Sequence, residues 1–143
     1  MKTVTIRSDN GNRLSVNVIG YERTPNGDFH DSNWIMANIE FAIGAFSGNY
    51  NICMLTYEYV SFRDQLKNLY DTLKGFAELD TMEGQIKLTY NGNGRGGIKI
   101  EGTLKDRAGD GNKLSFSGNL DQSYIKLLID DLNELINEYP IIK

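Results

Sequence analysis

The segment 92–97, Gly-Asn-Gly-Arg-Gly-Gly, matches the G-x-G-x-x-G pattern of dinucleotide-binding proteins. Such a site needs a helix directly after the glycines, because the helix N-terminus holds the pyrophosphate. Here the glycines are followed by Ile98-Lys99-Ile100, whose two-residue alternation predicts a strand. We therefore interpret 92–97 as a hairpin turn and expect no nucleotide cofactor.

The single histidine, His30, lies between Asp28 and Asp31, and a neighbouring carboxylate can orient a catalytic histidine. We favour a solvated loop, since Asp and Gly are typical turn residues; a catalytic loop stays open as the alternative. One histidine and the single Cys53 cannot supply a zinc site of the usual kind. The segment 106–112 lacks the ligand spacing and closing Glu of a calcium loop, so it predicts a turn. We expect no catalytic, cofactor-binding or metal-binding residues.

An acidic helix near the C-terminus is the first candidate surface for a partner. After a strand at 114–120, Asp121 begins a helix that Pro140 ends, with one apolar stripe formed by Tyr124, Ile125, Leu128, Ile129, Leu132, Leu135, Ile136 and Tyr139. Its other side carries Asp130, Asp131, Glu134 and Glu138. Acids at a helix C-terminus oppose the dipole and cost roughly 0.3–1 kcal/mol each. Two interpretations stay open: an ordinary solvated face, or a surface kept acidic for a partner with basic groups.

The second candidate surface lies on a strand predicted over 34–43. Its two faces are Ile35, Ala37, Ile39, Phe41 and Ile43 on one side, and Trp34, Met36, Asn38, Glu40 and Ala42 on the other. Trp is common at the centre of protein interfaces, so Trp34 and Glu40 are candidates for partner binding. A Trp and a Met beneath a helix belong more often to the core, and that is the interpretation we favour.

Composition narrows the class of protein. A chain of 143 residues suits one domain over 1–143, and the net charge of −4, without a basic cluster, argues against direct nucleic-acid binding. A lone cysteine favours a reducing compartment, and the chain has neither an apolar leader nor a long apolar run. We expect a cytoplasmic protein with no membrane contact, and we favour a monomer.

The periodic segments predict an α+β fold in the order four strands, helix, three strands, helix. The strands are expected at 4–6, 14–18, 34–43, 50–59, 86–90, 98–104 and 114–120, with the first helix capped by Ser61 and ended by Gly75. The connecting turns are short, which requires antiparallel neighbours. The expected architecture is a mostly antiparallel sheet of about seven strands with two amphipathic helices packed on it.

Several segments together resemble a family of small bacterial proteins. They are residues 33–41 and 44–48, then 62–66, 84–86 and 114–116, and finally Leu120-Asp121-Gln122-Ser123-Tyr124 with Tyr139-Pro140. The family is the WapI-type immunity proteins of bacterial polymorphic toxin systems, which act in contact-dependent inhibition. The similarity spans about residues 33–140, and Asp121-Gln122-Ser123-Tyr124 is its most distinctive piece.

This resemblance implies a cognate inhibitor rather than an enzyme. Such a protein binds the C-terminal toxin domain of a large secreted protein, often a tRNA-directed nuclease, and protects the cell that makes it. Two alternatives stay open. One is an enzyme centred on a carboxylate or on the loop around His30; the other is a small-ligand binder with a pocket lined by Tyr50, Tyr57 or Tyr90.

Overall fold

The computed structural model describes residues 1–22 and 29–143. In this part of the chain, eight strands form two four-stranded antiparallel sheets. Sheet A has the order β1 (Lys2–Arg7), β2 (Arg13–Tyr21), β3 (Trp34–Ile43), β4 (Phe46–Leu55). Sheet B has the order β5 (Lys74–Asp80), β6 (Ile86–Asn93), β7 (Ile98–Lys105), β8 (Lys113–Leu120). The helices are the short α1 (Phe29–Ser32) and two of 17 residues each, α2 (Thr56–Thr72) and α3 (Gln122–Glu138).

The predicted α+β class and antiparallel pairing are confirmed, but the strand count is eight rather than seven. The missed strand is β5, in which buried Ala77 and Leu79 alternate with more exposed residues. The sequence pattern predicts Gly75 as the residue just past the helix. The residue in the left-handed conformation that ends α2 is instead Leu73 (φ +61°), and Gly75 already belongs to β5.

The predicted start of the first long helix was also wrong. The helix begins at Thr56 rather than after Ser61, and residues 56–59, predicted to be strand, form its first turn. Pairing between β3 and β4 ends where Trp34 faces Leu55, so the strand has no neighbour beyond that point. The Glu58 carboxylate reaches back to accept a hydrogen bond from the Leu55 N–H at 2.7 Å, a capping arrangement that fixes the helix start.

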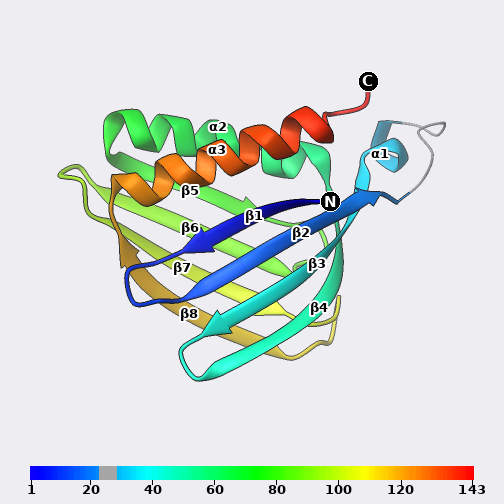
Figure 1. Ribbon diagram of the computed structural model, residues 1–143, viewed down its shortest axis with the longest axis horizontal. Helices are drawn as coiled ribbons and strands as arrows, with labels where there is room; N and C mark the ends of the chain where they lie inside the picture. The colour runs from blue at the N-terminus through cyan, green and yellow to red at the C-terminus, as the bar shows by residue number, and fades with distance from the viewer. Residues whose placement is uncertain (23–28) are drawn as a thin grey trace.

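The two long helices close the gap between one edge of each sheet. Helix α3 packs against edge strand β1, α2 packs against edge strand β5, and the helices pack against each other (Figure 1). Arg63 Nη1 donates to Asn133 Oδ1 at 2.7 Å across the helix pair. The helices therefore line two sheet edges instead of covering the outer face of either sheet.

The inner faces of both sheets and of both long helices contribute to one hydrophobic core. Phe62, Leu66 and Leu69 of α2 are buried there, as the helical spacing predicts, and the Phe62 ring meets the Tyr90 ring of β6 at 5.7 Å. Full burial of such side chains contributes about 1.5–3 kcal/mol each. No helix in the described part of the chain combines the length and apolar character that a membrane crossing needs.

Polar contacts join segments of the two sheets and the C-terminal segment. Tyr50 Oη of β4 donates to the Gln85 carbonyl, just before β6, at 2.9 Å. In a separate place, the Asp9 N–H in the β1–β2 turn donates to the Asn119 carbonyl of β8 at 2.8 Å. Tyr21 Oη of β2 donates to the Pro140 carbonyl, just after α3, at 2.6 Å. These bonds join segments that are far apart in sequence.

Candidate partner-binding surfaces

Helix α3 begins where the sequence predicts. Asp121 is the N-cap residue, and its Oδ1 accepts a hydrogen bond from the Ser123 N–H at 2.9 Å. The hydrogen bonds from Ser123 lower the pKa of the Asp121 carboxyl below its ordinary value of 3.8. The apolar stripe of the helix is buried at Ile125, Leu128 and Leu132, among others. The orientation of its acidic side follows from this fixed start.

The acidic side of α3 presents three of its four carboxylates to solvent. Asp130, Glu134 and Glu138 are exposed on successive turns, and we call these three residues the α3 acidic face. Lys126 Nζ contacts Asp130 Oδ1 at 2.6 Å, and this hydrogen bond and charge raise the pKa of Lys126. Asp131 points elsewhere: its Oδ2 accepts from the Thr5 N–H of β1 at 3.0 Å.

The face of β3 that carries Trp34, Met36 and Glu40 is not a core surface, so the interpretation of this face as core is wrong. Met36 is 38% exposed and Glu40 is exposed, whereas Ile35 and Ile39 on the opposite face are fully buried. Trp34 itself is half-buried. The reason is architectural: neither long helix covers the outer face of sheet A. Trp34 and Glu40 thus lie on a surface, where Glu40 Oε1 accepts from Asn17 Nδ2 at 2.9 Å.

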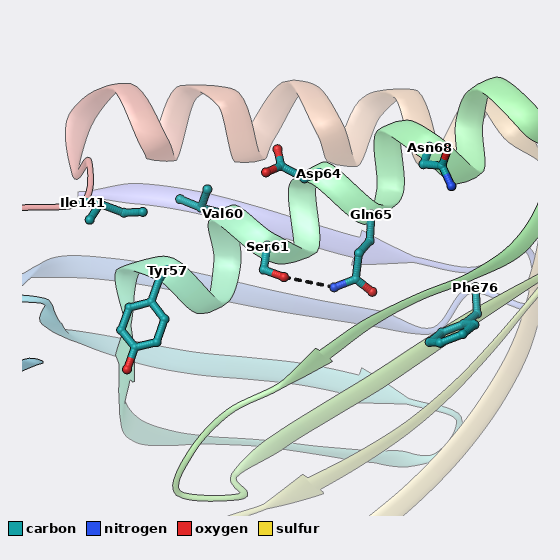
Figure 2. A pocket seen from close by; sticks show the side chains of 8 residues that line it. All are labelled: Tyr57, Val60, Ser61, Asp64, Gln65, Asn68, Phe76 and Ile141. Carbon is teal, nitrogen blue, oxygen red and sulfur yellow. Dashed lines mark hydrogen bonds between the residues drawn. The ribbon is translucent and has the colours of Figure 1, made fainter.

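The structure contains a third candidate surface, which is not among the surfaces expected from the sequence. Two hollows of about 460 and 340 Å³ lie along α2 and share Tyr57, Ser61, Gln65 and Phe76. We call them together the α2–β5 groove. Figure 2 shows the side chains of α2 projecting along one side of the helix, with Phe76 opposite them on β5. The groove requires β5, so missing that strand also hid the groove.

One end of the α2–β5 groove is acidic. The second hollow is also lined by Glu58, Glu78 and Asp80. Glu58 accepts hydrogen bonds from two main-chain N–H groups, those of Leu55 at 2.7 Å and Met82 at 2.6 Å. Burial nevertheless raises the pKa of the Glu58 carboxyl, and the nearby charges of Asp80 and Glu83 raise it further. The carboxylates therefore create a negative potential at this end of the groove.

The side chain of Gln65 forms hydrogen bonds with the edge of β5 inside the groove. Its Oε1 accepts from the Glu78 N–H at 3.0 Å, and its Nε2 lies 3.5 Å from the Glu78 carbonyl. The same Nε2 donates to Ser61 Oγ at 3.1 Å, the bond drawn in Figure 2. The amide thus takes the place that a peptide group of a neighbouring strand would take.

The glycine-rich segment forms a hairpin turn, as predicted. Residues 94–97 connect β6 to β7, and no helix follows them. A Cβ on Gly92 would lie 2.5 Å from the Leu73 carbonyl oxygen, and the Gly94 N–H donates to that same oxygen at 2.7 Å. These glycines let the turn approach the end of α2, which is a packing role.

The other sequence candidates do not assemble into one site. Asp28 and the side chain of His30 lie outside the described residues, and Asp31 belongs to α1. Segment 106–112 is a turn in which Asn112 donates twice to Asp106, from its side-chain Nδ2 to Oδ2 at 3.2 Å and from its N–H to Oδ1 at 2.7 Å. These two hydrogen bonds lower the pKa of Asp106. Within the described residues, no group of three or more His, Cys, Asp or Glu side chains could hold a metal ion.

The three tyrosines offered as lining residues of a small-ligand pocket lie in different places. Tyr90 is buried in the core, Tyr50 spans the gap to Gln85, and Tyr57 lines the α2–β5 groove. Of the three, Tyr57 alone lines the two hollows described above. The small-ligand alternative therefore stays a prediction that concerns the groove at Tyr57.

Comparison with known proteins gives a match to a family model. Residues 5–140 match the family described as "Immunity protein WapI-like family". No curated protein matches the chain. Among solved structures, one described as "Crystal structures of trypanosoma bruciei MRP1/MRP2" aligns with a TM-score of 0.49 and 11% identity, covering 96% of this chain and 84% of that chain. Because the family match runs from β1 to the residues after α3, the chain belongs to the WapI-like family of immunity proteins.

Proposed function

We propose that this immunity protein binds a cognate toxin domain and neutralises it by occupancy, without turnover, in the cytoplasm of the cell that makes the toxin. The observation that carries the proposal is the family match over residues 5–140. An inhibitor of this kind needs a complementary surface rather than catalytic residues. The chain offers exposed carboxylates, and the family supplies the immunity role.

The toxin that we propose is a nuclease, and a tRNA-directed one agrees with the family resemblance. A nuclease must present basic groups to a phosphate backbone, so its cleft carries positive potential. The α3 acidic face could occupy such a cleft, with Glu134 and Glu138 in no ion pair within the described residues. Asp130 forms an ion pair with Lys126. Asp131 borders this surface but is bound to β1.

A second contact could come from the outer face of sheet A around Trp34 and Glu40. Aromatic side chains that are half-buried on a surface supply contact area at a low entropic cost, which is why Trp is frequent at interfaces. Trp34 is half-buried and Glu40 is exposed on this face. We propose it as an accessory surface whose variants are measured separately from those of the α3 acidic face.

The direct test is co-expression with the toxin domain encoded beside the gene of this protein. We expect growth to be rescued and the two chains to purify as a complex. Absence of rescue and of a complex would refute the proposed function. Reversing all three charges, with Asp130→Lys, Glu134→Lys and Glu138→Lys, should weaken the complex about 100-fold, because like charges then face the basic cleft.

A matched single reversal separates a local contact from a general effect of net charge. Glu134→Lys is compared with Asp110→Lys, whose carboxylate is exposed in the β7–β8 turn. We expect Glu134→Lys to weaken the complex about tenfold and Asp110→Lys to change it less than twofold at physiological salt. Equal affinities for the two variants would contradict the role of the α3 acidic face and leave the immunity role intact.

A further inference from the structure

We propose that the α2–β5 groove binds an extended, basic segment of the toxin partner, with Arg or Lys side chains directed toward Glu78 and Asp80. This inference rests on the proposed function, since it names the chemistry of the partner. It concerns a surface separate from the α3 acidic face. Four properties of the groove support it: its exposed aromatic wall, its charge, its main-chain edge and its geometry.

The wall of the groove exposes more apolar surface than a solvated edge strand requires. Phe76 is 61% exposed although it lies beside two hollows, and Tyr57 lines both of them from α2. Aromatic groups beside a concavity are frequent anchor points for a partner. The long aliphatic stem of an Arg or Lys side chain could cover such a ring while its charged end stays polar.

The charges that line the groove all have one sign. Glu58, Glu78 and Asp80 line the second hollow, and among the described residues no Lys, Arg or His lines either hollow. The first hollow includes Asp64, but that carboxylate already binds Arg63 at 2.8 Å. Negative charge is therefore concentrated at the Glu78–Asp80 end, where a basic side chain would be attracted.

A basic side chain lies near this end but forms no ion pair with it. Lys87 of β6 is the register partner of Asp80, so the two side chains share a face of sheet B. The described residues contain no ion pair that involves Glu78 or Asp80. A cationic side chain of the toxin would thus meet two carboxylates, those of Glu78 and Asp80, that form no ion pair with another described residue.

The main-chain edge of β5 adds hydrogen-bonding groups to the groove. Because the Glu78 N–H and C=O face Gln65, those of Phe76 and Asp80, two residues away, face the same side. On this side, neither of those residues has a main-chain hydrogen bond to another described residue. Such an edge can accept hydrogen bonds from the backbone or guanidinium groups of an arriving segment.

The spacing of the groove fits an extended segment rather than a helix. Phe76, Glu78 and Asp80 project from the same face of β5, because they are two residues apart in a strand. Each of these side chains is therefore about 7 Å from the next. Alternate side chains of an extended chain repeat at that same distance. A segment with basic residues at alternate positions would therefore meet each carboxylate in turn.

The first experiment uses a defined probe, the peptide acetyl-Val-Arg-Val-Arg-Val-Arg-amide. Its binding to the full chain is followed by amide chemical shifts in NMR. We expect shifts centred on residues 57–65 and 76–80. The double variant Glu78→Gln/Asp80→Asn should weaken binding about tenfold, because both carboxylates lose their charge. Shifts confined to the α3 acidic face, or no binding at all, would overturn the proposal.

A control that removes the same charge elsewhere is essential. Asp71→Asn/Asp110→Asn also removes two exposed carboxylates, and neither residue lines the groove. It should change peptide affinity less than twofold at 0.15 M salt, where distant charges are screened. Equal losses in the two double variants would show attraction to net charge alone and would overturn the proposal.

The aromatic wall has its own matched pair. Phe76→Ala is compared with Phe46→Ala, whose ring is 65% exposed at the β3–β4 turn. We expect Phe76→Ala to weaken peptide binding about fivefold and Phe46→Ala to leave it unchanged. Both rings are exposed, so both variants should fold. Equal effects of the two substitutions would contradict an anchor role for Phe76.

The final arm repeats the charge variants in the complex with the toxin domain. If the unmodified chain binds no toxin domain, the proposed function has failed, and so has the identity of the groove's partner. If the complex forms and Glu78→Gln/Asp80→Asn leaves its affinity unchanged, only the groove proposal has failed. A loss of about tenfold in that variant, absent in the Asp71→Asn/Asp110→Asn control, would support it.

Discussion

Two side-chain amides in this protein bind a main-chain peptide in the same way, in opposite surroundings. Asn33 is fully buried; its Nδ2 donates to the Ile142 carbonyl at 3.0 Å and its Oδ1 accepts from the Ile142 N–H at 2.8 Å. Gln65 binds Glu78 in the same way in the half-exposed α2–β5 groove: its Nε2 lies 3.5 Å from the Glu78 carbonyl, and its Oε1 accepts from the Glu78 N–H at 3.0 Å. Each amide pairs with a main-chain peptide as a second peptide group would.

The two sites differ in whether another group could replace the side-chain amide at the main-chain peptide that it binds. The Asn33 side chain is fully buried, so its bonds hold the C-terminal segment against β3 and α2, where the Thr56 hydroxyl also donates to Asn33 Oδ1. The Gln65 pair lies beside open hollows, where water or a partner could replace the amide at little cost. We infer that the first pair serves the fold, whereas the second leaves an edge available for binding.

The largest effect that this comparison predicts is on Asn33. Asn33→Ala should lower the free energy of unfolding by about 3 kcal/mol, because three hydrogen bonds disappear and buried polar groups remain unpaired. Denaturant unfolding measures this loss, and exchange of the Ile142 amide should become faster. The matched control is Asn68→Ala on the exposed side of α2, with a change within about 0.5 kcal/mol. A loss below about 1 kcal/mol for Asn33→Ala would contradict the comparison.

Glu58 extends the comparison to a carboxylate. Its two oxygens bind the N–H groups of Leu55 and Met82, and so join the start of α2 to the β5–β6 turn. Glu58→Ala should lower the free energy of unfolding by about 2 kcal/mol, since hydrogen bonds to a charged group are stronger than neutral ones but this site is partly exposed. Glu83→Ala, in the same turn, is the control for loss of negative charge alone. Equal losses would contradict a structural role for Glu58.

Gln65 should be the least costly of the three to remove. Gln65→Ala is expected to lower the free energy of unfolding by about 0.5–1 kcal/mol, because water can hydrate the Glu78 peptide in its place. Denaturant unfolding of Gln65→Ala and Asn33→Ala under the same conditions compares the two losses in the free energy of unfolding directly. A loss as large as that of Asn33→Ala would mean that the groove edge is closed in the folded protein. That result would also count against the α2–β5 groove as a binding site.

Local pattern was enough to predict the elements with strong periodicity. Asp121 and the apolar stripe behind it placed α3, and the alternation from Trp34 to Ile43 gave β3 at its observed bounds. The antiparallel pairing followed from the short turns between strands. These predictions depend on residues that are neighbours in the chain, which is why sequence alone sufficed for them.

The start of α2 could not be predicted in this way, because local propensity and tertiary context disagree there. Tyr57 and Tyr59 favour a strand, but β3 ends at Trp34 and leaves them no neighbour to pair with. The Glu58 carboxylate instead caps a helix that begins there, by accepting from the Leu55 N–H. Its second hydrogen bond is with Met82, which is 24 residues away in the sequence. Nothing in the local pattern indicates that contact.

The candidate surfaces show the same limit. The spacing of Asp130, Glu134 and Glu138 placed them on one exposed face, whereas Asp131 is drawn to β1 by a contact 126 residues away in the sequence. The Trp34 face was assigned to the core because sequence cannot tell that both long helices lie at sheet edges. One signal for the α2–β5 groove was present: Phe76, Glu78 and Asp80 alternate with the buried Ala77 and Leu79.

The smallest expected effect is a pH dependence of opposite sign at the starts of α2 and α3. Burial raises the pKa of Glu58 above its ordinary value of 4.5, so the folded protein binds this proton more tightly than the unfolded chain does. Its contribution to stability is therefore present below pH 4.5 and is lost as the pH rises through the raised value. Hydrogen bonds lower the pKa of Asp121, so its contribution is present above pH 3.8 and is lost as the pH falls through the lowered value.

Denaturant unfolding of the wild type, Glu58→Gln and Asp121→Asn across pH 2.5–7 separates the two effects. From neutral pH down to 4.5, the wild type should gain stability relative to Glu58→Gln, because only the wild type takes up the proton at that site. Below pH 3.8 it should lose stability relative to Asp121→Asn, which keeps a neutral cap at every pH. Two differences with the same sign would contradict this assignment. The buried carboxylate would then be stabilised by its two N–H donors more than burial destabilises it, and α2 would begin as α3 does, with a cap that prefers its charge.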